Sequence, residues 1–429
     1  MNLNRQACVG CSGNMFDNIL DRQKLSVGSL EKEASNDVSI LRQVTAAKQV
    51  EVVKTRKSLT KKELLIQELR ASLEKKLLDA EATKSIPLSF QTCKELNITN
   101  YDDTCSPDHS KCLNQNIPED LNERLEKLVF PENMPIPDRY IDILNYMRKQ
   151  ITTKQDLIIV HALSSNHFNE TQYMLKDLHS TAFPVLKNFT LIIYDLGLKE
   201  SELILLKKHC RCTVVKFPFE KFPTYFRTMK CFAWKIFVIA AHYEQANVTI
   251  WIDASISTRN VSGIPLLIDR ARSRGIQQRC NRGMTHNPYH TLPQMFEAFG
   301  DSPCAHLSFR QCEGGYGVYH NEPLIRHAVI KPWVACASRE FCICPVNQGA
   351  VQYCYPLPKR TVGICMRNDQ SAISIILASL FREKFDHFVH DTTWLQKTDR
   401  GQKNDYFWQL EVNSTVKTVD NKPVDIKPV

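Results

Sequence analysis

From residue 156 onward, short apolar runs alternate with amphipathic segments, and this alternation constrains the fold more than any other feature of the sequence. The apolar runs are rich in Ile, Val, Leu and Phe and predict buried strands, whereas the spacing of apolar residues between them predicts helices. This order indicates an α/β domain with a mixed, mostly parallel sheet flanked by helices. The predicted strands are residues 157–161, 189–195, 213–217, 248–253, 305–309 and 316–320, and the predicted helices are residues 171–179, 201–209, 226–242, 266–273, 322–336 and 370–384.

The 429 residues exceed the usual size of one hydrophobic core, so we expect further segments around this domain. Residues 1–88 predict a helical, coiled-coil-like stalk or linker, because apolar side chains recur at every seventh position from Val52 to Ala80. Lys62 and Lys76 interrupt that seam, so we expect weak homo-oligomerisation through this helix or, as the alternative, a solvated single helix. The remaining segments are a cysteine-containing connector with a helix (89–155), the α/β domain (156–396) and a polar C-terminal tail (397–429).

The 16 cysteines lack the paired CxxC spacing of a zinc ribbon or zinc finger. The CxC pairs Cys210/Cys212 and Cys342/Cys344 favour a separate disulfide partner for each cysteine, with a bound metal as the alternative. Six Asn-x-Ser/Thr sequons offer acceptors for N-glycosylation. Both features indicate the lumen of the secretory pathway, in a Golgi-like compartment, or the extracellular space. The sequon asparagines are Asn97, Asn169, Asn188, Asn247, Asn260 and Asn413.

No signal peptide or transmembrane segment is visible, because no apolar run approaches the length of about 18 residues that a membrane-spanning helix needs. We therefore expect membrane attachment only through an anchor absent from this chain, with unconventional export or a cytosolic location as alternatives. Lys and Arg exceed Asp and Glu by 55 − 46 = 9, but the positive charges are spread along the chain. This distribution predicts no nucleic-acid partner and favours small anionic ligands.

Residues 249–255 contain the most informative local pattern, an apolar strand that ends on Asp253 and is followed by small residues. In open α/β sheets, ligands bind at the carboxyl ends of the strands. A hard divalent cation that bridges a diphosphate takes one or two carboxylate oxygens and completes its shell with phosphate and water. Asp253 is therefore predicted as a metal ligand, and an aspartate that caps the next turn is the alternative.

Several short motifs, taken in order, carry a resemblance to a known family. They are the run from Ile193 to Leu198, Ala233-Trp234-Lys235, Trp251-Ile252-Asp253-Ala254-Ser255, Trp333 with Cys336-Ala337, Cys342-Ile343-Cys344-Pro345 and Asp369-Gln370-Ser371-Ala372. Over residues 156–394 the chain resembles an uncharacterised, nematode-expanded family that is in turn similar to GT-A glycosyltransferases. The resemblance implies a GT-A-like fold and a nucleotide-diphosphate sugar as donor, for which we expect a UDP-linked sugar.

The resemblance also implies a metal site. GT-A enzymes bind Mn²⁺ (or Mg²⁺) and the nucleotide diphosphate through a DxD motif, whose first position matches Asp253. Ser255 stands at the position of the second carboxylate, and a hydroxyl is a poorer ligand for a hard cation. GT-A enzymes often add a C-terminal histidine, which implies His387 or His390 as a further metal ligand. A lone histidine is more often a surface or core residue, which is the alternative.

Three further residues are predicted to act on bound substrate. The Asp369-Gln370 pair resembles one that such families place at a helix start facing the reacting sugar, which implies Asp369 as a catalytic carboxylate. Its alternative role is to cap that helix. Lys235 is predicted to contact the donor diphosphate, or else to form the polar edge of its helix. Glu313 precedes two glycines that let a ligand approach the backbone, and is predicted as a catalytic base, with a tight turn as the alternative.

These features together predict a metal-dependent glycosyltransferase that moves a hexose or N-acetylhexosamine from the nucleotide donor to a hydroxyl of a glycan or glycoprotein. Ser255 favours an alternative, a non-catalytic GT-A-like binding protein of the lumen or the extracellular space. A structural partner tethered by a coiled coil is a third hypothesis. The sequence has no Gly-x-Ser-x-Gly, Walker, His-Glu-x-x-His or Rossmann glycine motif, which argues against the commonest hydrolases, kinases and dehydrogenases.

Overall fold

The computed structural model describes residues 59–85, 118–132, 134–150, 155–258, 260, 262–280, 286–345, 354, 362–391, 396–402 and 404–420. The chain divides into two compact units, Met1–Leu65 and Ile66–Val429. In the first unit the described residues lead into helix α2 (Lys61–Asp79), where Thr60 and Glu63 form a capping box. Glu63 N donates to Thr60 Oγ1 at 3.3 Å, and Thr60 N donates to Glu63 Oε2 at 2.8 Å.

Within the second unit, α2 packs inward, and the stalk or linker predicted for residues 1–88 stays a prediction. Ile66 and Leu73, two members of the seventh-residue repeat, are buried, and Lys76 Nζ lies 3.1 Å from Glu322 Oε1. The apolar stripe of α2 is therefore used inside the chain, because an amphipathic helix that packs on a core buries this face. Val52, where the repeat begins, lies outside the described residues.

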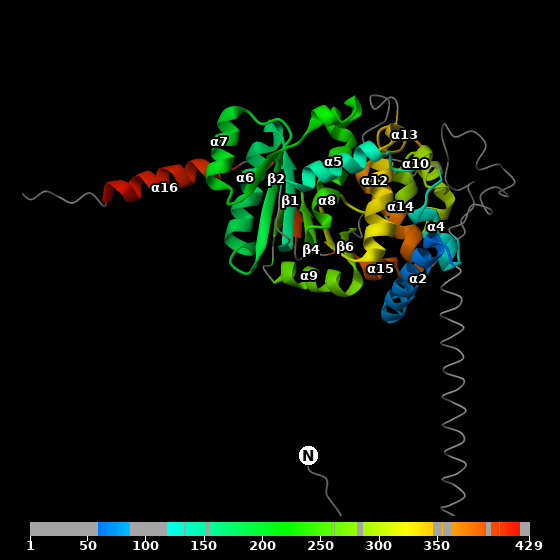
Figure 1. The fold of residues 1–429 in the computed structure, drawn as a ribbon. Helices are drawn as coiled ribbons and strands as arrows, with labels where there is room; N and C mark the ends of the chain where they lie inside the picture. The colour runs from blue at the N-terminus through cyan, green and yellow to red at the C-terminus, as the bar shows by residue number, and fades with distance from the viewer. Residues whose placement is uncertain are drawn as a thin grey trace, which may run out of the picture. The chain divides into compact units, whose positions relative to one another are not determined.

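The second unit is built on a seven-stranded sheet with the order β3-β2-β1-β4-β7-β6-β8 (Figure 1). Strands β1 to β4 run parallel to one another, β7 is antiparallel to β4 and β6, and β8 is parallel to β6. The predicted α/β class with a mixed, mostly parallel sheet is thus confirmed. The strands are β1 (Gln155–Leu163), β2 (Phe189–Asp195), β3 (Thr213–Lys216), β4 (Ala246–Ile252), β6 (Ile276–Arg279), β7 (Tyr316–His320) and β8 (Val389–His390).

Helices cover both faces of this sheet (Figure 1). Side chains alternate along β4, so Ile250 and Ile252 join an apolar core with residues of α6 and α9, whereas Trp251 faces α8. Every residue of α8 is buried, because this helix lies between the sheet and the helices α5, α12 and α14. The helices are α5 (Asp138–Arg148), α6 (Phe168–Asp177), α7 (Glu200–His209), α8 (Ala233–Tyr243), α9 (Gly263–Arg274), α12 (Lys331–Ala337) and α14 (Asp369–Phe381).

Two predicted elements differ from the structure. Residues 305–309, predicted as a strand, belong to a 3-10 turn (Pro303–His306) and the residues after it, and His306 Nε2 donates to the buried Asp301 Oδ2 at 2.9 Å. Residues 322–336, predicted as one helix, form a short helix (Pro323–Ile325), a π turn (Arg326–Ile330) and α12. The spacing of apolar residues does not report the local hydrogen bonds of the first segment or the wider π turn of the second.

The segment predicted as a polar tail from residue 397 is folded over much of its length. Strand β9 (Gln396–Thr398) pairs antiparallel with β5 (Ile256–Thr258). Strand β5 begins directly after Ser255. Helix α16 (Tyr406–Asp420) follows, and its Phe407 is fully buried. Several side chains hold this mostly polar helix on the core: Tyr406 OH forms a hydrogen bond with His179 Nδ1 at 3.0 Å, and Leu410 packs on the same core as Phe407. The sequence did not predict this folded segment.

Five disulfides join described cysteines. Cys342 and Cys344 have separate partners, Cys336 and Cys231, as the CxC spacing predicted. The other CxC pair differs, because Cys210 and Cys212 are bonded to each other. The remaining bonds are Cys280–Cys312 and Cys354–Cys365.

Among the described residues, no helix is both long enough and apolar enough to span a lipid bilayer.

Candidate functional site

Asp253 stands immediately after β4, at the edge of the sheet where β1, β2 and β3 also end. Its backbone N–H donates to Gly315 O at 2.8 Å, and its Oδ1 accepts from Trp251 Nε1 at 2.9 Å. Trp251 can reach Asp253 because residues two apart on a strand share a face. The Asp253 side chain is 32% exposed, so its carboxylate is held through Oδ1 and is still partly accessible to solvent.

Lys235 is a buried cation in the middle of this site. Its side chain is 2% exposed, and Nζ lies 3.2 Å from Asp253 Oδ1 and 3.1 Å from Asp369 Oδ2. Nζ also donates to Gly314 O at 3.2 Å, so each of its three hydrogens has an acceptor. Burial by itself would lower the pKa of Lys235, but the two carboxylates outweigh it and the pKa is raised. Lys235 is therefore a fixed positive charge that links Asp253 to Asp369.

Asp369 is the first residue of α14 and is completely enclosed. Both of its carboxylate oxygens are buried, and among the described residues neither has a hydrogen-bond partner apart from the ion pair of Oδ2 with Lys235. Burial raises the pKa of Asp369, and the Lys235 ammonium opposes that shift. The Asn368 backbone before it has φ 39°, and Trp333 Nε1 donates to Asp369 O at 3.2 Å. The predicted contact of Asp369 with a reacting sugar stays a prediction, since in this structure the Asp369 carboxylate is paired with the Lys235 ammonium.

Gly314 lies next to the carboxylate of Asp369, and Gly315 lies near the carboxylate of Asp253. A Cβ atom added at Gly314 would overlap Asp369 Oδ2, and one added at Gly315 would lie 3.1 Å from the Ile256 side chain. Glycine is therefore required at position 314 because a charged side chain occupies the space of a Cβ. The sequence predicted a close approach to the backbone at this loop; the group that approaches Gly314 is the chain's own Asp369.

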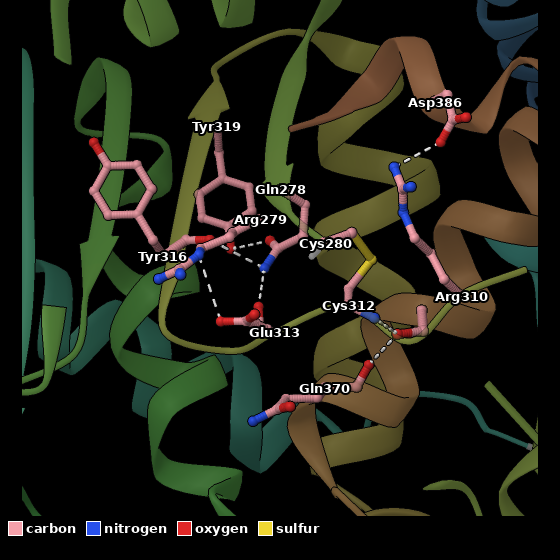
Figure 2. The surroundings of a disulfide bond; sticks show 11 residues. Gln278, Arg279, Cys280, Arg310, Cys312, Glu313, Tyr316, Tyr319, Gln370 and Asp386 are labelled. Carbon is pink, nitrogen blue, oxygen red and sulfur yellow. Dashed lines mark hydrogen bonds and ion pairs between the residues drawn. A yellow bond between two sulfur atoms is a disulfide. The ribbon is translucent and has the colours of Figure 1, made fainter. Parts of the chain in front are cut away.

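Glu313, the predicted base on the acceptor side, is held by the end of β6 (Figure 2). Its Oε2 lies 3.4 Å from Arg279 Nε, and its backbone O accepts from Gln278 Nε2 at 2.6 Å. Its side chain is 17% exposed. Glu313 is thus next to the loop that contacts Lys235, but its carboxylate is paired with a buried guanidinium. A role as base stays a prediction.

The structure does not bring the two predicted histidine ligands to Asp253. His387 Nδ1 forms a hydrogen bond with Thr83 Oγ1 at 2.8 Å, beside α2. His390 packs edge-on against Tyr316, with ring centroids 5.9 Å apart. Burial lowers the pKa of His387 to about 4 and that of His390 to about 3. Within the described ranges, the one group of three ligand-type side chains is His290 with Cys354 and Cys365, whose sulfurs are bonded to each other.

His167 is a residue that the sequence did not single out. It follows β1, and its Nδ1 lies 2.8 Å from Glu170 Oε2. The hydrogen bond to Glu170 raises the pKa of His167, and the charge of Asp253 adds to the shift. A half-exposed imidazole at the same sheet edge as Asp253 can therefore carry positive charge. A histidine in a loop after a strand is a weak signal in one sequence, and only its charge interaction with Asp253 distinguishes it.

The donor set can be tested for a divalent cation. Among the described residues, the side-chain hydrogen bond and the ion pair of Asp253 both use Oδ1, and Oδ2 can serve as the carboxylate oxygen for an ion. Ser255 is half-buried two residues on and offers a hydroxyl. One carboxylate oxygen is enough for an ion that arrives with a diphosphate and keeps phosphate and water as its other ligands. The residues therefore fit Mn²⁺ or Mg²⁺ bound together with a nucleotide.

Comparisons with known proteins identify one family model. The model described as "Protein of unknown function (DUF1647)" matches residues 88–240, which include Lys235 but end before Asp253. No curated protein matches the chain.

Solved structures similar to this chain include glycosyltransferases. The galactosyltransferase LgtC in complex with donor and acceptor sugar analogues is 13% identical, with a TM-score of 0.30 over 52% of this chain and 70% of that chain. Core-mannan synthase A (CmsA/Ktr4) from Aspergillus fumigatus in an Mn/GDP form is 10% identical, with a TM-score of 0.36 over 56% and 74%. The mannosyltransferase Ktr4p from S. cerevisiae is 6% identical, with a TM-score of 0.35 over 64% and 84%. These scores support no comparison of site residues.

Proposed function

We propose that the chain binds a nucleotide-diphosphate sugar at the edge of the sheet beside Asp253 and transfers the sugar to a hydroxyl of a glycan or glycoprotein. The observation that carries the proposal is that the carboxylate of Asp253 is held through one oxygen and is partly exposed. Its Oδ1 is held by Trp251 and Lys235, and its side chain is 32% exposed at the carboxyl edge of the sheet. Ligands of open α/β sheets bind at this edge. The family resemblance, in which Asp253 matches the first DxD position, supports the same reading.

Each residue has a role in this proposal. Asp253, with Ser255 beside it, holds Mn²⁺ or Mg²⁺ that enters with the diphosphate, and such an ion neutralises the charge of the leaving nucleotide. The acceptors of all three Lys235 N–H groups belong to the chain itself, so Lys235 orients Asp253 and does not bind the diphosphate directly. Asp369 acts through Lys235 as a positioning residue. His167 adds positive charge on the solvent side, where the diphosphate would bind.

The proposal is tested by incubating the full chain with Mn²⁺ and a panel of UDP- and GDP-sugars and measuring the release of nucleotide diphosphate. Wild type should release it from at least one donor, faster when an acceptor glycan is present. Asp253→Asn should lower the rate about a hundredfold, because a neutral amide loses the charge that draws the cation. Asp156→Asn is the matched control, since Asp156 is half-exposed at the start of β1 and pairs with Arg272. Equal rates for Asp253→Asn and wild type would contradict the assignment.

The alternative function is a binding protein that retains the nucleotide site without transfer. One observation favours it specifically: Asp369, the residue whose position resembles a catalytic carboxylate, is enclosed and paired with Lys235. Nucleotide binding that depends on Asp253, with no release of nucleotide from any donor and acceptor tested, would support the binding protein over the transferase.

We also propose that the chain works in the lumen of the secretory pathway or outside the cell. The disulfides among its described cysteines are typical of oxidising compartments. Each sequon asparagine within the described ranges is exposed, which leaves room for a glycan; these are Asn169, Asn188, Asn247, Asn260 and Asn413. Protein isolated from its native source should lose mass on treatment with an N-glycosidase. An unchanged mass together with freely reactive thiols in unreduced protein would place it in the cytosol.

A further inference from the structure

We propose that the disulfide Cys280–Cys312 is a positioning element of the donor site, because it fixes the loop that holds Asp253, Lys235 and Asp369 together. This inference rests on the proposed function and adds a covalent support to that site. Cys280 directly follows β6, and Cys312 stands two residues before Gly314. Both cysteines are fully buried, and their Cα atoms are 4.0 Å apart.

The loop after Cys312 contacts each charged residue of the site. Gly314 O accepts from Lys235 Nζ at 3.2 Å, and Gly315 O accepts from the backbone N–H of Asp253 at 2.8 Å. The Cα of Gly314 packs so closely on Asp369 that no Cβ fits between them. A shift of this loop by about 1 Å would lengthen all of these contacts at once, and displacements of that size lower catalytic rates by up to about a hundredfold.

Hydrogen bonds hold the same loop on two sides (Figure 2). Toward the sheet, Glu313 N donates to Arg279 O at 2.8 Å and Gln278 Nε2 donates to Glu313 O at 2.6 Å. Toward α14, Cys312 N donates to Ser374 Oγ at 2.8 Å. These bonds can open one at a time. The disulfide differs because it limits the distance between β6 and Cys312 at all times, and it acts where the sheet, the loop and α14 meet.

The test compares two variants of the full chain that each lose one disulfide. Cys280→Ser/Cys312→Ser opens the bond at the site. Cys210→Ser/Cys212→Ser is the control, because that bond lies between the end of α7 and β3, at the far edge of the sheet. Affinity for UDP and for GDP with Mn²⁺ is measured at a temperature where circular dichroism shows both variants folded. We expect a loss of about tenfold or more for the first variant and less than about twofold for the second.

A purely structural disulfide would lower the melting temperature of the first variant and leave its affinity below the transition unchanged, and this result would overturn the inference. If the first variant does not fold, wild type is partly reduced with a graded thiol, alkylated and mapped by mass spectrometry. Affinity should then fall in step with the fraction of open Cys280–Cys312; unchanged affinity with this bond open overturns the inference.

If wild type binds neither nucleotide, the proposed function fails and the inference fails with it. If wild type and the first variant bind equally, the inference alone fails.

Discussion

At the scale of single residues, the candidate site depends most on Lys235. Its ammonium is the one described cation in contact with both Asp253 and Asp369, and it is buried with the second of them. A buried ion pair adds little stability by itself, but removing one partner leaves an uncompensated charge in a medium of low polarity. Lys235 therefore ties the stability of the fold to the geometry of the site.

We predict that Lys235→Met lowers the free energy of unfolding by about 3–5 kcal/mol, because it leaves the enclosed Asp369 without its cation. The double variant Lys235→Met/Asp369→Asn removes both charges and should be clearly more stable than the sum of the two single changes implies. Denaturant unfolding of the four proteins measures the coupling. Additive losses would show that the two side chains do not form the buried pair.

The position of Asp253 was predictable from the sequence, and the contacts of Lys235 were not. A carboxylate after an apolar strand indicates the carboxyl edge of a sheet whatever the rest of the fold is. The acceptors of Lys235 come from the residue after β4, the glycine loop and α14, which only the tertiary structure brings together. For this reason the sequence assigned Lys235 to the donor diphosphate, whereas the structure surrounds it with the chain's own oxygens.

At the scale of elements, apolar runs predicted most strands of the sheet, but they missed a polar strand and wrongly predicted a strand at residues 305–309. The predicted strands 189–195 and 316–320 coincide with β2 and β7. Strand β6 was missed because it reads Ile-Gln-Gln-Arg, and its polar side chains are buried. The side-chain amide of Gln278 donates hydrogen bonds to Glu313 O and Tyr316 O. Such long-range hydrogen bonds leave no periodic signal in the sequence.

Helix α16 yields a test with two adjacent residues. Phe407 is fully buried and packs on Phe168 and His209, whereas Trp408 is 66% exposed. Phe407→Ala should lower the free energy of unfolding by about 3–5 kcal/mol through lost burial and a cavity. Trp408→Ala should change it by less than about 0.5 kcal/mol. Thermal or denaturant unfolding measures both, and equal effects of the two changes would mean that α16 does not dock as described.

At the scale of the whole molecule, buried neutral histidines couple the fold to pH. His161 donates from Nδ1 to Ile252 O at 2.8 Å, and His242 Nε2 accepts from Tyr194 OH at 2.8 Å. Burial lowers the pKa of both histidines to about 4. Below the unfolded-state pKa of about 6.5 the unfolded chain therefore binds more protons than the folded chain, so stability falls as pH falls from there toward 4.

We predict that between pH 6.5 and pH 4 each of these histidines lowers the free energy of unfolding by up to about 1.4 kcal/mol per pH unit. Melting temperatures measured in steps from pH 7.5 to pH 4.5 test this. His242→Gln removes one titrating group and should flatten the dependence, although its own loss of packing lowers stability at every pH. A melting temperature that stays level across this range would contradict the neutral state of the two side chains.

The central claim is that a nucleotide diphosphate binds beside Asp253, and thermal unfolding with Mn²⁺ tests it most directly. At about a hundred times its dissociation constant, the correct nucleotide should stabilise wild type by roughly 2.7 kcal/mol. UDP and GDP are the first probes, and Asp156→Asn should respond as wild type does. Asp253→Asn should remain folded and lose the stabilisation. If no nucleotide diphosphate raises the melting temperature of folded wild type, or if Asp253→Asn is stabilised equally, the claim is wrong.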